Sequence, residues 1–494
     1  MTRLRTVAAI AVAAGTFATG VSSSGIEAAR VTAPVEAWVG GYAIGSAHVV
    51  LHVALSEHEG RLRGAAAVGS AARPVRTALR QAQVRDDHVS LTLGNGALLE
   101  GRTSGDRITG TARAGNGRGR FELLRLRPSP ADELRRAVGA YRFADGTVAG
   151  LFLDPFEQSL RVIDYAGGDM RQLAQVSANG FVGGPRLLVP WPFRSRVELV
   201  RDPAGQVVAL RRDGRLATRI PLVVEPATFQ NGDVRLAGKL MRPQGPGPFP
   251  AVVLVHGSIR GTRDSADLWG AFFASRGIAM LSYDKRGVGE STGQYDRSAD
   301  EGNLRALAED ALAGVEWLRQ RADIDAGRIG LVGGSQAGWT ILLAASQSSD
   351  VAFAAIQSGP AMSVGRQRAF SKLTGDGSRV PPPTGAEIRA ALDGLPDDGF
   401  DPRPALQALR IPVLWQLGGV DKRMYTPESV ANLDAITAAG GHDFTVLVYP
   451  AGAHSLRETR HGLSSEEVLA ARFVPGVFAD LAAWLAAHVG TPQP

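Results

Sequence analysis

Residues 329–338 read IGLVGGSQAG, and residues 339–345 read WTILLAA. The first run is typical of a buried strand and the second of a helix, so a sharp turn around Ser335 must join them. Such a turn strains the backbone of its serine and is tolerable only with small neighbours, a demand that Gly333 and Ala337 satisfy. The hydroxyl would then stand clear of the sheet. This stretch therefore predicts an exposed nucleophilic serine.

The small residues around the serine also have a simpler explanation. They would let a helix pack closely on a strand in an α/β protein that has no catalytic serine. The stretch departs from the strict G-x-S-x-G pattern, because Ala337 stands two residues after the serine and Gly338 follows one later. A histidine, an acid and a second oxyanion donor in the required order would favour the catalytic interpretation.

Buried strands and longer helices alternate along the chain after Val223. Continuous apolar runs such as Ala251–Val255 and Val413–Leu417 are typical of parallel strands that are covered on both faces. Helical stretches lie between such runs, as at residues 308–319. The pattern predicts the α/β fold class, with a doubly wound, mostly parallel sheet over residues 224–494. Ligands in such sheets bind at the carboxyl ends of the strands.

Two small antiparallel β units are expected before that sheet. Residues 34–127 alternate short apolar stretches with polar turns such as Asn95-Gly96, which is typical of a barrel or sandwich. A second small β unit is predicted over residues 131–223, after a Pro-Ser-Pro linker. Neither unit offers a converging acid, base and nucleophile, so chemistry is expected elsewhere.

The first 29 residues have the pattern of a secretory signal peptide. Arg3 and Arg5 precede a run of apolar and small residues from 7 to 21, and small polar residues follow it. The run is too poor in strongly apolar residues to make a spanning helix. We therefore expect residues 1–29 to direct export to the periplasm or the extracellular space, with no stable membrane span.

Composition excludes several classes of site and partner. The chain has no cysteine, so it has neither disulfides nor cysteine-bound zinc. Its net charge is +6, but the basic residues are nearly all arginine and are spread over the whole length. No dense basic block with interleaved aromatic residues occurs, so no nucleic-acid partner is expected. The sequence does not fix the oligomeric state.

An acid and a histidine follow two later strands in the required order. Asp421 lies in the sequence GGVD after the run 413–417, and His454 lies in the sequence AGAH after the run 444–449. Each residue stands just beyond a predicted strand end. His454 would take the proton from Ser335, while Asp421 would fix the tautomer of the imidazole and stabilise its charged form.

A second backbone donor is expected in the loop after the strand at 251–255. His256-Gly257-Ser258 follows that strand directly, and Gly257 allows a sharp turn. The N–H groups of Ser258 and Gln336 could then face one point and form an oxyanion hole. The alternative is a simple tight turn. His256 itself is expected to hold the loop rather than to act as the base.

Together these motifs resemble the α/β-hydrolase superfamily, near its dienelactone-hydrolase-like and prolyl-oligopeptidase-like branches. The resemblance covers residues 224–494 and includes the segment YDKRGVGES at 283–291, which we expect to be structural, with Asp284 and Arg286 able to form a local ion pair. It implies an α/β-hydrolase sheet, a triad of the serine, aspartate and histidine named above, and no metal or organic cofactor. The insertion at 359–410 resembles the lids of that family.

The resulting functional hypothesis is an exported serine hydrolase. It would cleave a small-molecule carboxylic ester through an acyl-enzyme intermediate. A prolyl-oligopeptidase-like peptidase or a thioesterase is the alternative among enzymes. An alternative of another class is a catalytically idle envelope or carbohydrate-binding protein whose β units do the binding.

Overall fold

A computed structural model describes residues 36–58, 61–69, 75–154 and 158–490 of the chain. The expected signal peptide at 1–29 lies outside these residues. Within them, no helix is long and apolar enough to cross a membrane. Backbone contacts group the chain into two compact units, one ending at Thr218 and the other containing Arg219–Pro494 together with 139–151 and 163–170. The expected domain limits stay predictions.

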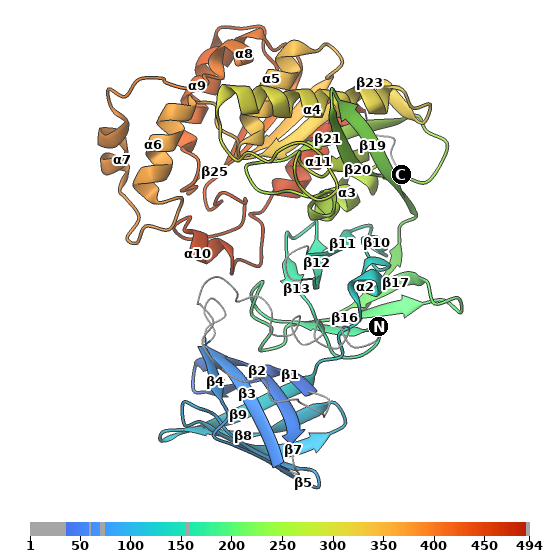
Figure 1. The fold of residues 1–494 in the computed structure, drawn as a ribbon, viewed down its shortest axis with the longest axis vertical. Helices are drawn as coiled ribbons and strands as arrows, with labels where there is room; N and C mark the ends of the chain where they lie inside the picture. The colour runs from blue at the N-terminus through green and yellow to red at the C-terminus, as the bar shows by residue number, and fades with distance from the viewer. Residues whose placement is uncertain (1–35, 59–60, 70–74, 155–157, 491–494) are drawn as a thin grey trace. The chain divides into compact units, whose positions relative to one another are not determined.

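The first sheet has nine strands in the order β4-β3-β2-β1-β9-β8-β7-β6-β5, and each neighbouring pair is antiparallel (Figure 1). Its interior is filled by inward-facing apolar side chains, among which Leu51, Leu91 and Leu99 are fully buried. The strands are β1 (Glu36–Ile44), β2 (Ala47–His58), β3 (Arg61–Gly69), β4 (Val75–Ala78), β5 (Gln81–Arg85), β6 (His88–Thr92), β7 (Leu98–Ser104), β8 (Arg107–Ala114) and β9 (Gly117–Arg125).

The second sheet also has nine strands, in the order β13-β12-β11-β10-β18-β17-β16-β15-β14. Strands β10 and β11 pair in antiparallel fashion, and so do β14 to β18 in succession. The short helix α2 (Ala131–Arg135) precedes it. The strands are β10 (Gly139–Phe143), β11 (Val148–Leu153), β12 (Leu160–Asp164), β13 (Met170–Gln172), β14 (Ala174–Gln175), β15 (Gly180–Gly183), β16 (Ser195–Arg201), β17 (Val207–Arg212) and β18 (Arg215–Arg219).

The third sheet has eight strands in the order β19-β20-β22-β21-β23-β24-β25-β26. The pairs β19–β20 and β20–β22 are antiparallel, whereas the pairs from β22–β21 to β25–β26 are parallel. The strands are β19 (Leu222–Asn231), β20 (Val234–Pro243), β21 (Phe249–Val255), β22 (Ala279–Tyr283), β23 (Ile324–Gly334), β24 (Phe353–Gln357), β25 (Val413–Gly418) and β26 (Phe444–Tyr449).

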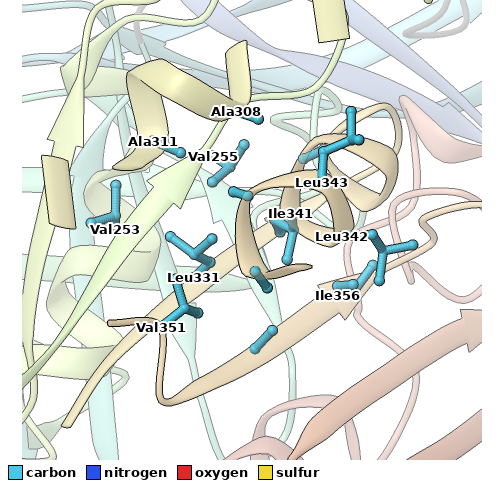
Figure 2. Close-up of a cluster of buried hydrophobic side chains, with 14 of the residues drawn as sticks. Val253, Val255, Ala308, Ala311, Leu331, Ile341, Leu342, Leu343, Val351 and Ile356 are labelled. Carbon is cyan, nitrogen blue, oxygen red and sulfur yellow. The ribbon is translucent and has the colours of Figure 1, made fainter. Parts of the chain in front are cut away.

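Helices between these strands cover the third sheet. Figure 2 shows Ile341 of α5 packed toward Leu331 of β23 and Val255 of β21. Burying such a side chain contributes about 1.5–3 kcal/mol. The helical segments are η1 (Arg263–Ala266), α3 (Asp267–Ala274), α4 (Glu301–Arg319), α5 (Ala337–Gln347), α6 (Val364–Thr374), α7 (Gly385–Leu392), α8 (Arg403–Ala408), α9 (Thr426–Ala438), α10 (Ser464–Glu467) and α11 (Val477–Val489).

The predicted fold class is wrong for this chain. A doubly wound, mostly parallel α/β-hydrolase sheet with two small antiparallel units was expected, but two nine-stranded, nearly closed antiparallel sheets outweigh one mixed eight-stranded sheet. The expectation missed strands whose composition is atypical. Strand β3 reads RLRGAAAVG and β5 reads QAQVR, so both lack most of the branched and aromatic residues that mark strands. Here cross-strand pairing decides the structure, not local propensity.

Candidate active site

Ser335 lies on the turn between β23 and α5, in a strained backbone conformation. Its φ is +59°, in the left-handed region, which costs a residue with a side chain about 1–3 kcal/mol. The turn is closed by the N–H of Gly338, which donates to the Ser335 carbonyl at 2.8 Å. A Cβ on Gly333 would lie 2.8 Å from the Cβ of Ala337, so larger residues would not fit there. The local sequence thus holds the serine in this turn.

The loop after β21 lies directly against this turn. A Cβ on Gly257 would lie 3.4 Å from the Cβ of Ser335 and 4.0 Å from the backbone nitrogen of Gln336. Within the described part of the chain, the backbone N–H groups of Ser258 and Gln336 donate to no other group. Buried or half-buried N–H groups are nearly always paired in proteins. Two unpaired donors beside a strained serine are suited to a developing oxyanion.

Asp421 and His454 form a buried hydrogen-bonded pair. The Nδ1 of His454 lies 2.8 Å from Oδ2 of Asp421, whose side chain is fully buried. The other carboxylate oxygen accepts from the N–H groups of Arg423 at 2.7 Å and Met424 at 2.9 Å. Since the carboxylate accepts, Nδ1 carries the proton and Nε2 is left as the acceptor. This is the tautomer that a general base needs.

The electrostatic surroundings favour the protonated form of His454. Burial lowers the pKa of this imidazole, but the carboxylates of Asp421 and Glu467 outweigh burial and raise the pKa above its usual value. Glu467 is itself held in place, because its Oε1 accepts from the backbone N–H and the hydroxyl of Ser455, at 2.7 and 2.8 Å. An imidazolium that forms during proton transfer would therefore be stabilised.

The sheet brings the serine, the acid and the histidine to one edge. Ser335, Asp421 and His454 follow β23, β25 and β26, and parallel neighbours from β23 to β26 end at the same edge. The loops touch there, because a Cβ on Gly418 would lie 2.5 Å from the carbonyl oxygen of Gly452. Among the described residues, no hydrogen bond joins the hydroxyl of Ser335 to His454. Such bonds are often long in a free enzyme and tighten with substrate.

His256 has the surroundings of a structural residue. Its ring is buried and donates through Nε2 to the carbonyl of Tyr283. Burial lowers the pKa of the imidazole to about 4, so it is neutral near pH 7. Two other histidines are also occupied, since Nδ1 of His442 lies 3.0 Å from the carbonyl of Leu409 and Nδ1 of the exposed His461 lies 2.9 Å from the carboxylate of Glu466.

The segment at 283–291 contains one wrong prediction. Asp284 does not pair with Arg286. Its carboxylate accepts from the backbone N–H of Arg263 at 2.8 Å, whereas Arg286 forms an ion pair with the buried Asp310 at 2.6 Å. Both charges follow β22 but point to different neighbours, the first residue of η1 and helix α4. The pairing depends on tertiary contacts that sequence proximity does not indicate.

Sequence reasoning missed Lys285, which lies beside the candidate oxyanion donors. Its ammonium donates to the carbonyl of Gly257 at 2.8 Å and to the side-chain oxygen of Gln336 at 3.2 Å. A signal was present, because Lys285 is one of very few lysines in an arginine-rich chain and follows a buried strand at the same sheet edge.

The insertion at 359–410 is attached to the loop that carries Asp421. From helix α6, Gln367 donates to the carbonyl of Arg423 at 2.5 Å, and Thr374 donates to the carbonyl of Lys422 at 2.6 Å. These bonds hold the backbone on the carboxyl side of the acid. The expected role of the insertion as a lid stays a prediction.

Known proteins with similar sequences are hydrolases. Residues 231–371 match the family described as X-Pro dipeptidyl-peptidase (S15 family). The chain is 32% identical to esterase EstD of Thermotoga maritima over 25% of this chain and 34% of that protein. It is 34% identical to esterase FrsA of Escherichia coli over 24% of this chain and 29% of that protein. A solved esterase of Pyrococcus furiosus aligns with a TM-score of 0.40 and 16% identity, over 55% of this chain and 92% of that one.

The matches concern one region of the chain. The chain spans about a third of the length of the two curated relatives. The family match includes Ser258, Ser335 and Gln336 and ends before Asp421 and His454. Together with the motifs, these matches support an α/β-hydrolase superfamily serine hydrolase.

Proposed function

We propose that this protein is an exported carboxylesterase that works through a Ser335–His454–Asp421 triad and an acyl-enzyme intermediate. The observation that carries the proposal is the pair of unpaired N–H groups, on Ser258 and Gln336, next to a strained serine. Backbone strain and unpaired donors both lower the stability of the folded protein, and features of this kind are found mainly at functional sites. The names of EstD and FrsA favour esters as substrates.

Each residue has one role in the proposed reaction. The Ser335 hydroxyl attacks the ester carbonyl and gives its proton to Nε2 of His454. The negative charge on the carbonyl oxygen is met by the N–H groups of Ser258 and Gln336. His454 then protonates the leaving alcohol and later activates the water that releases the acid.

Asp421 supports this cycle without exchanging protons. Its carboxylate is buried and fully satisfied by backbone donors and the imidazole, so it keeps the histidine in one tautomer and one orientation. Its charge also stabilises the imidazolium that forms when the serine gives up its proton. No step requires a metal or an organic cofactor.

A peptidase is the second candidate function. The match of residues 231–371 to the X-Pro dipeptidyl-peptidase family favours it, since that match includes the serine and both oxyanion donors. Ester and amide hydrolysis share the same triad chemistry and differ in the leaving group that the histidine must protonate. Parallel assays with p-nitrophenyl acetate and Ala-Pro-p-nitroanilide separate the two candidates.

A fluorophosphonate probe tests the serine directly. We expect the probe to label the wild-type protein at Ser335, and the Ser335→Ala variant to lose both labelling and p-nitrophenyl acetate turnover. Ser346→Ala is the matched control, because Ser346 lies on the following helix with its hydroxyl bonded to the carbonyl of Leu343 at 3.0 Å. A folded wild-type protein that is not labelled would favour the idle binding protein instead.

Export is tested separately from catalysis. Expression of the full chain with residues 1–29 should deliver the protein to the periplasm or the medium, and mass spectrometry should find a mature amino terminus between Ser22 and Ala29. A chain that remains in the cytoplasm with its first residues intact would contradict export and leave the proposed catalysis untouched.

A further inference from the structure

Lys285 is an unusual buried charge at the candidate active site. It follows β22, and only 1% of its surface is exposed. Its ammonium donates to the carbonyl of Gly257 at 2.8 Å and to the side-chain oxygen of Gln336 at 3.2 Å. Gly257 directly precedes Ser258, whose N–H is the first candidate donor. Gln336 carries the second candidate donor on its own backbone N–H. The lysine therefore connects both sides of the oxyanion hole.

We propose that Lys285 is a positioning residue that aims and polarises the oxyanion donors, an inference that rests on the proposed function. The carbonyl of Gly257 and the N–H of Ser258 belong to one planar trans peptide group and point in opposite directions. A cation that fixes the carbonyl therefore fixes the direction of the N–H. Donation from an ammonium also withdraws electron density from the peptide, which strengthens the N–H as a donor.

The second donor residue is tied to the same ammonium. Besides accepting from Lys285, the side-chain amide of Gln336 donates to the carbonyl of Ser298 at 2.5 Å. The hydroxyl of Tyr295 donates to the carbonyl of Ser258 at 2.6 Å, and the ring of Tyr295 lies 5.6 Å from the ammonium. The segment from 295 to 298 thus closes a network in which Lys285 is the central donor.

A purely structural role does not account well for a lysine at position 285. Within the described chain no carboxylate forms an ion pair with Lys285, so its partners are a carbonyl, an amide and a ring. Burying an unpaired charge is costly, and an apolar side chain of similar volume would avoid that cost. Lys239 shows the contrast, because it is held by Asp264 at 2.8 Å and Asp267 at 2.5 Å.

The charges around Lys285 predict when its ammonium is lost. Burial lowers the pKa of Lys285 to about 8, against the smaller opposing effects of Asp296 and of Asp310 on α4. His256, on the loop after β21, is neutral, and Gln336 carries no charge. Arg286, the next residue along the chain, directs its guanidinium to Asp310. The ammonium should therefore be lost as the pH rises through about 8.

The test compares Lys285→Met, Lys285→Arg and the wild-type protein. We expect Lys285→Met to lower kcat for p-nitrophenyl acetate and the rate of fluorophosphonate labelling by about 10- to 100-fold, less than the loss of a whole donor. KM should change by less than about twofold, because the lysine does not touch substrate. Lys285→Arg should restore part of kcat. The alkaline limb near pH 8 should be absent from that variant, because arginine stays charged.

Lys239→Met is the matched control. It also removes a lysine, half-buried and paired with two carboxylates, so it should lower the unfolding temperature while leaving kcat of the folded protein unchanged. Equal labelling rates in Lys285→Met and wild type would overturn the inference and leave the proposed function standing. A folded wild type that neither reacts with the probe nor hydrolyses esters would overturn both. If Lys285→Met does not fold, a wild-type profile without an alkaline limb near pH 8 would overturn the inference.

Discussion

The nine-stranded sheet β1–β9 and the eight-stranded sheet bury their strands in different ways. Along β7 the buried residues Leu99 and Gly101 alternate with half-buried or exposed ones, whereas every residue of β25 is buried. Alternation leaves one face of the sheet in water, and continuous burial means that both faces are covered. A strand covered on both faces can place functional polar groups only at its ends. The candidate site lies at such ends.

Polar groups in the two sheets also differ in what they can do. On the first sheet, Arg102 pairs with Asp87 at 3.0 Å with both side chains largely exposed, and such pairs contribute little to stability. At the edge of the eight-stranded sheet, the carboxylate of Asp421 is fully buried against His454. Burial strengthens that interaction and shifts the pKa of the histidine. The same types of residue therefore serve solubility in one place and chemistry in the other.

The largest expected effect comes from removing His454, which follows β26, and His88 on β6 of the first sheet is the control. His454→Ala should lower kcat/KM for p-nitrophenyl acetate by about 10⁴-fold or more, because the serine loses its base. His88→Ala should leave kcat/KM unchanged, since His88 is exposed on β6 and its Nδ1 meets only the carbonyl of Gly101 at 3.0 Å. Steady-state kinetics on both variants measure this. An equal loss in the two would break the comparison.

Truncating one core leucine in each of the two sheets extends the comparison to the free energy of unfolding. Leu331→Ala and Leu91→Ala each remove a fully buried leucine, and each should cost about 2–5 kcal/mol. Leu331 lies on β23, four residues before Ser335, so its loss should also lower activity. Leu91 lies on β6 of the first sheet, so its loss should lower an unfolding transition without changing kcat. Calorimetry and ester assays on the same samples check both, and a loss of kcat in Leu91→Ala would contradict the separation.

The smallest effect is the pH dependence of the site. His454 must be neutral to accept the proton of Ser335, and its pKa is raised above the usual 6.5. As the pH falls through that raised pKa, kcat/KM should fall, so the acid limb should lie above pH 6.5. In Asp421→Asn the limb should move to lower pH, because one of the two carboxylates that raise the pKa is gone. A limb that stays in place would show that another group controls it.

The sequence indicates some strands well and others poorly, for a physical reason. The apolar runs at 251–255, 413–417 and 444–449 fall within or on β21, β25 and β26. Strands β21 and β25 are easy to recognise in the sequence because they are mostly or fully buried, so both of their faces must be apolar. Strands β3 and β5 are defined by their partners and turns, so their composition carries little signal. The share of antiparallel sheet in the fold was underestimated for this reason.

The candidate site divides in the same way. Ser335, Asp421 and His454 could be named because each follows a predicted strand, and the strand order places them at one edge. The contacts of Lys285 could not, since its partners lie about 28 and 51 residues away along the chain. The same holds for the pairing of Arg286 with Asp310. Sequence patterns indicate which elements form, while side-chain partners depend on how those elements pack.

The left-handed backbone at Ser335 has a consequence for how such chains diverge. Glycine adopts this conformation without strain, so Ser335→Gly would make the protein sturdier while removing its nucleophile. A descendant that is no longer under selection for hydrolysis would gain folding stability from that single replacement. A glycine at this position in a related chain would therefore indicate a protein that has lost its catalytic activity.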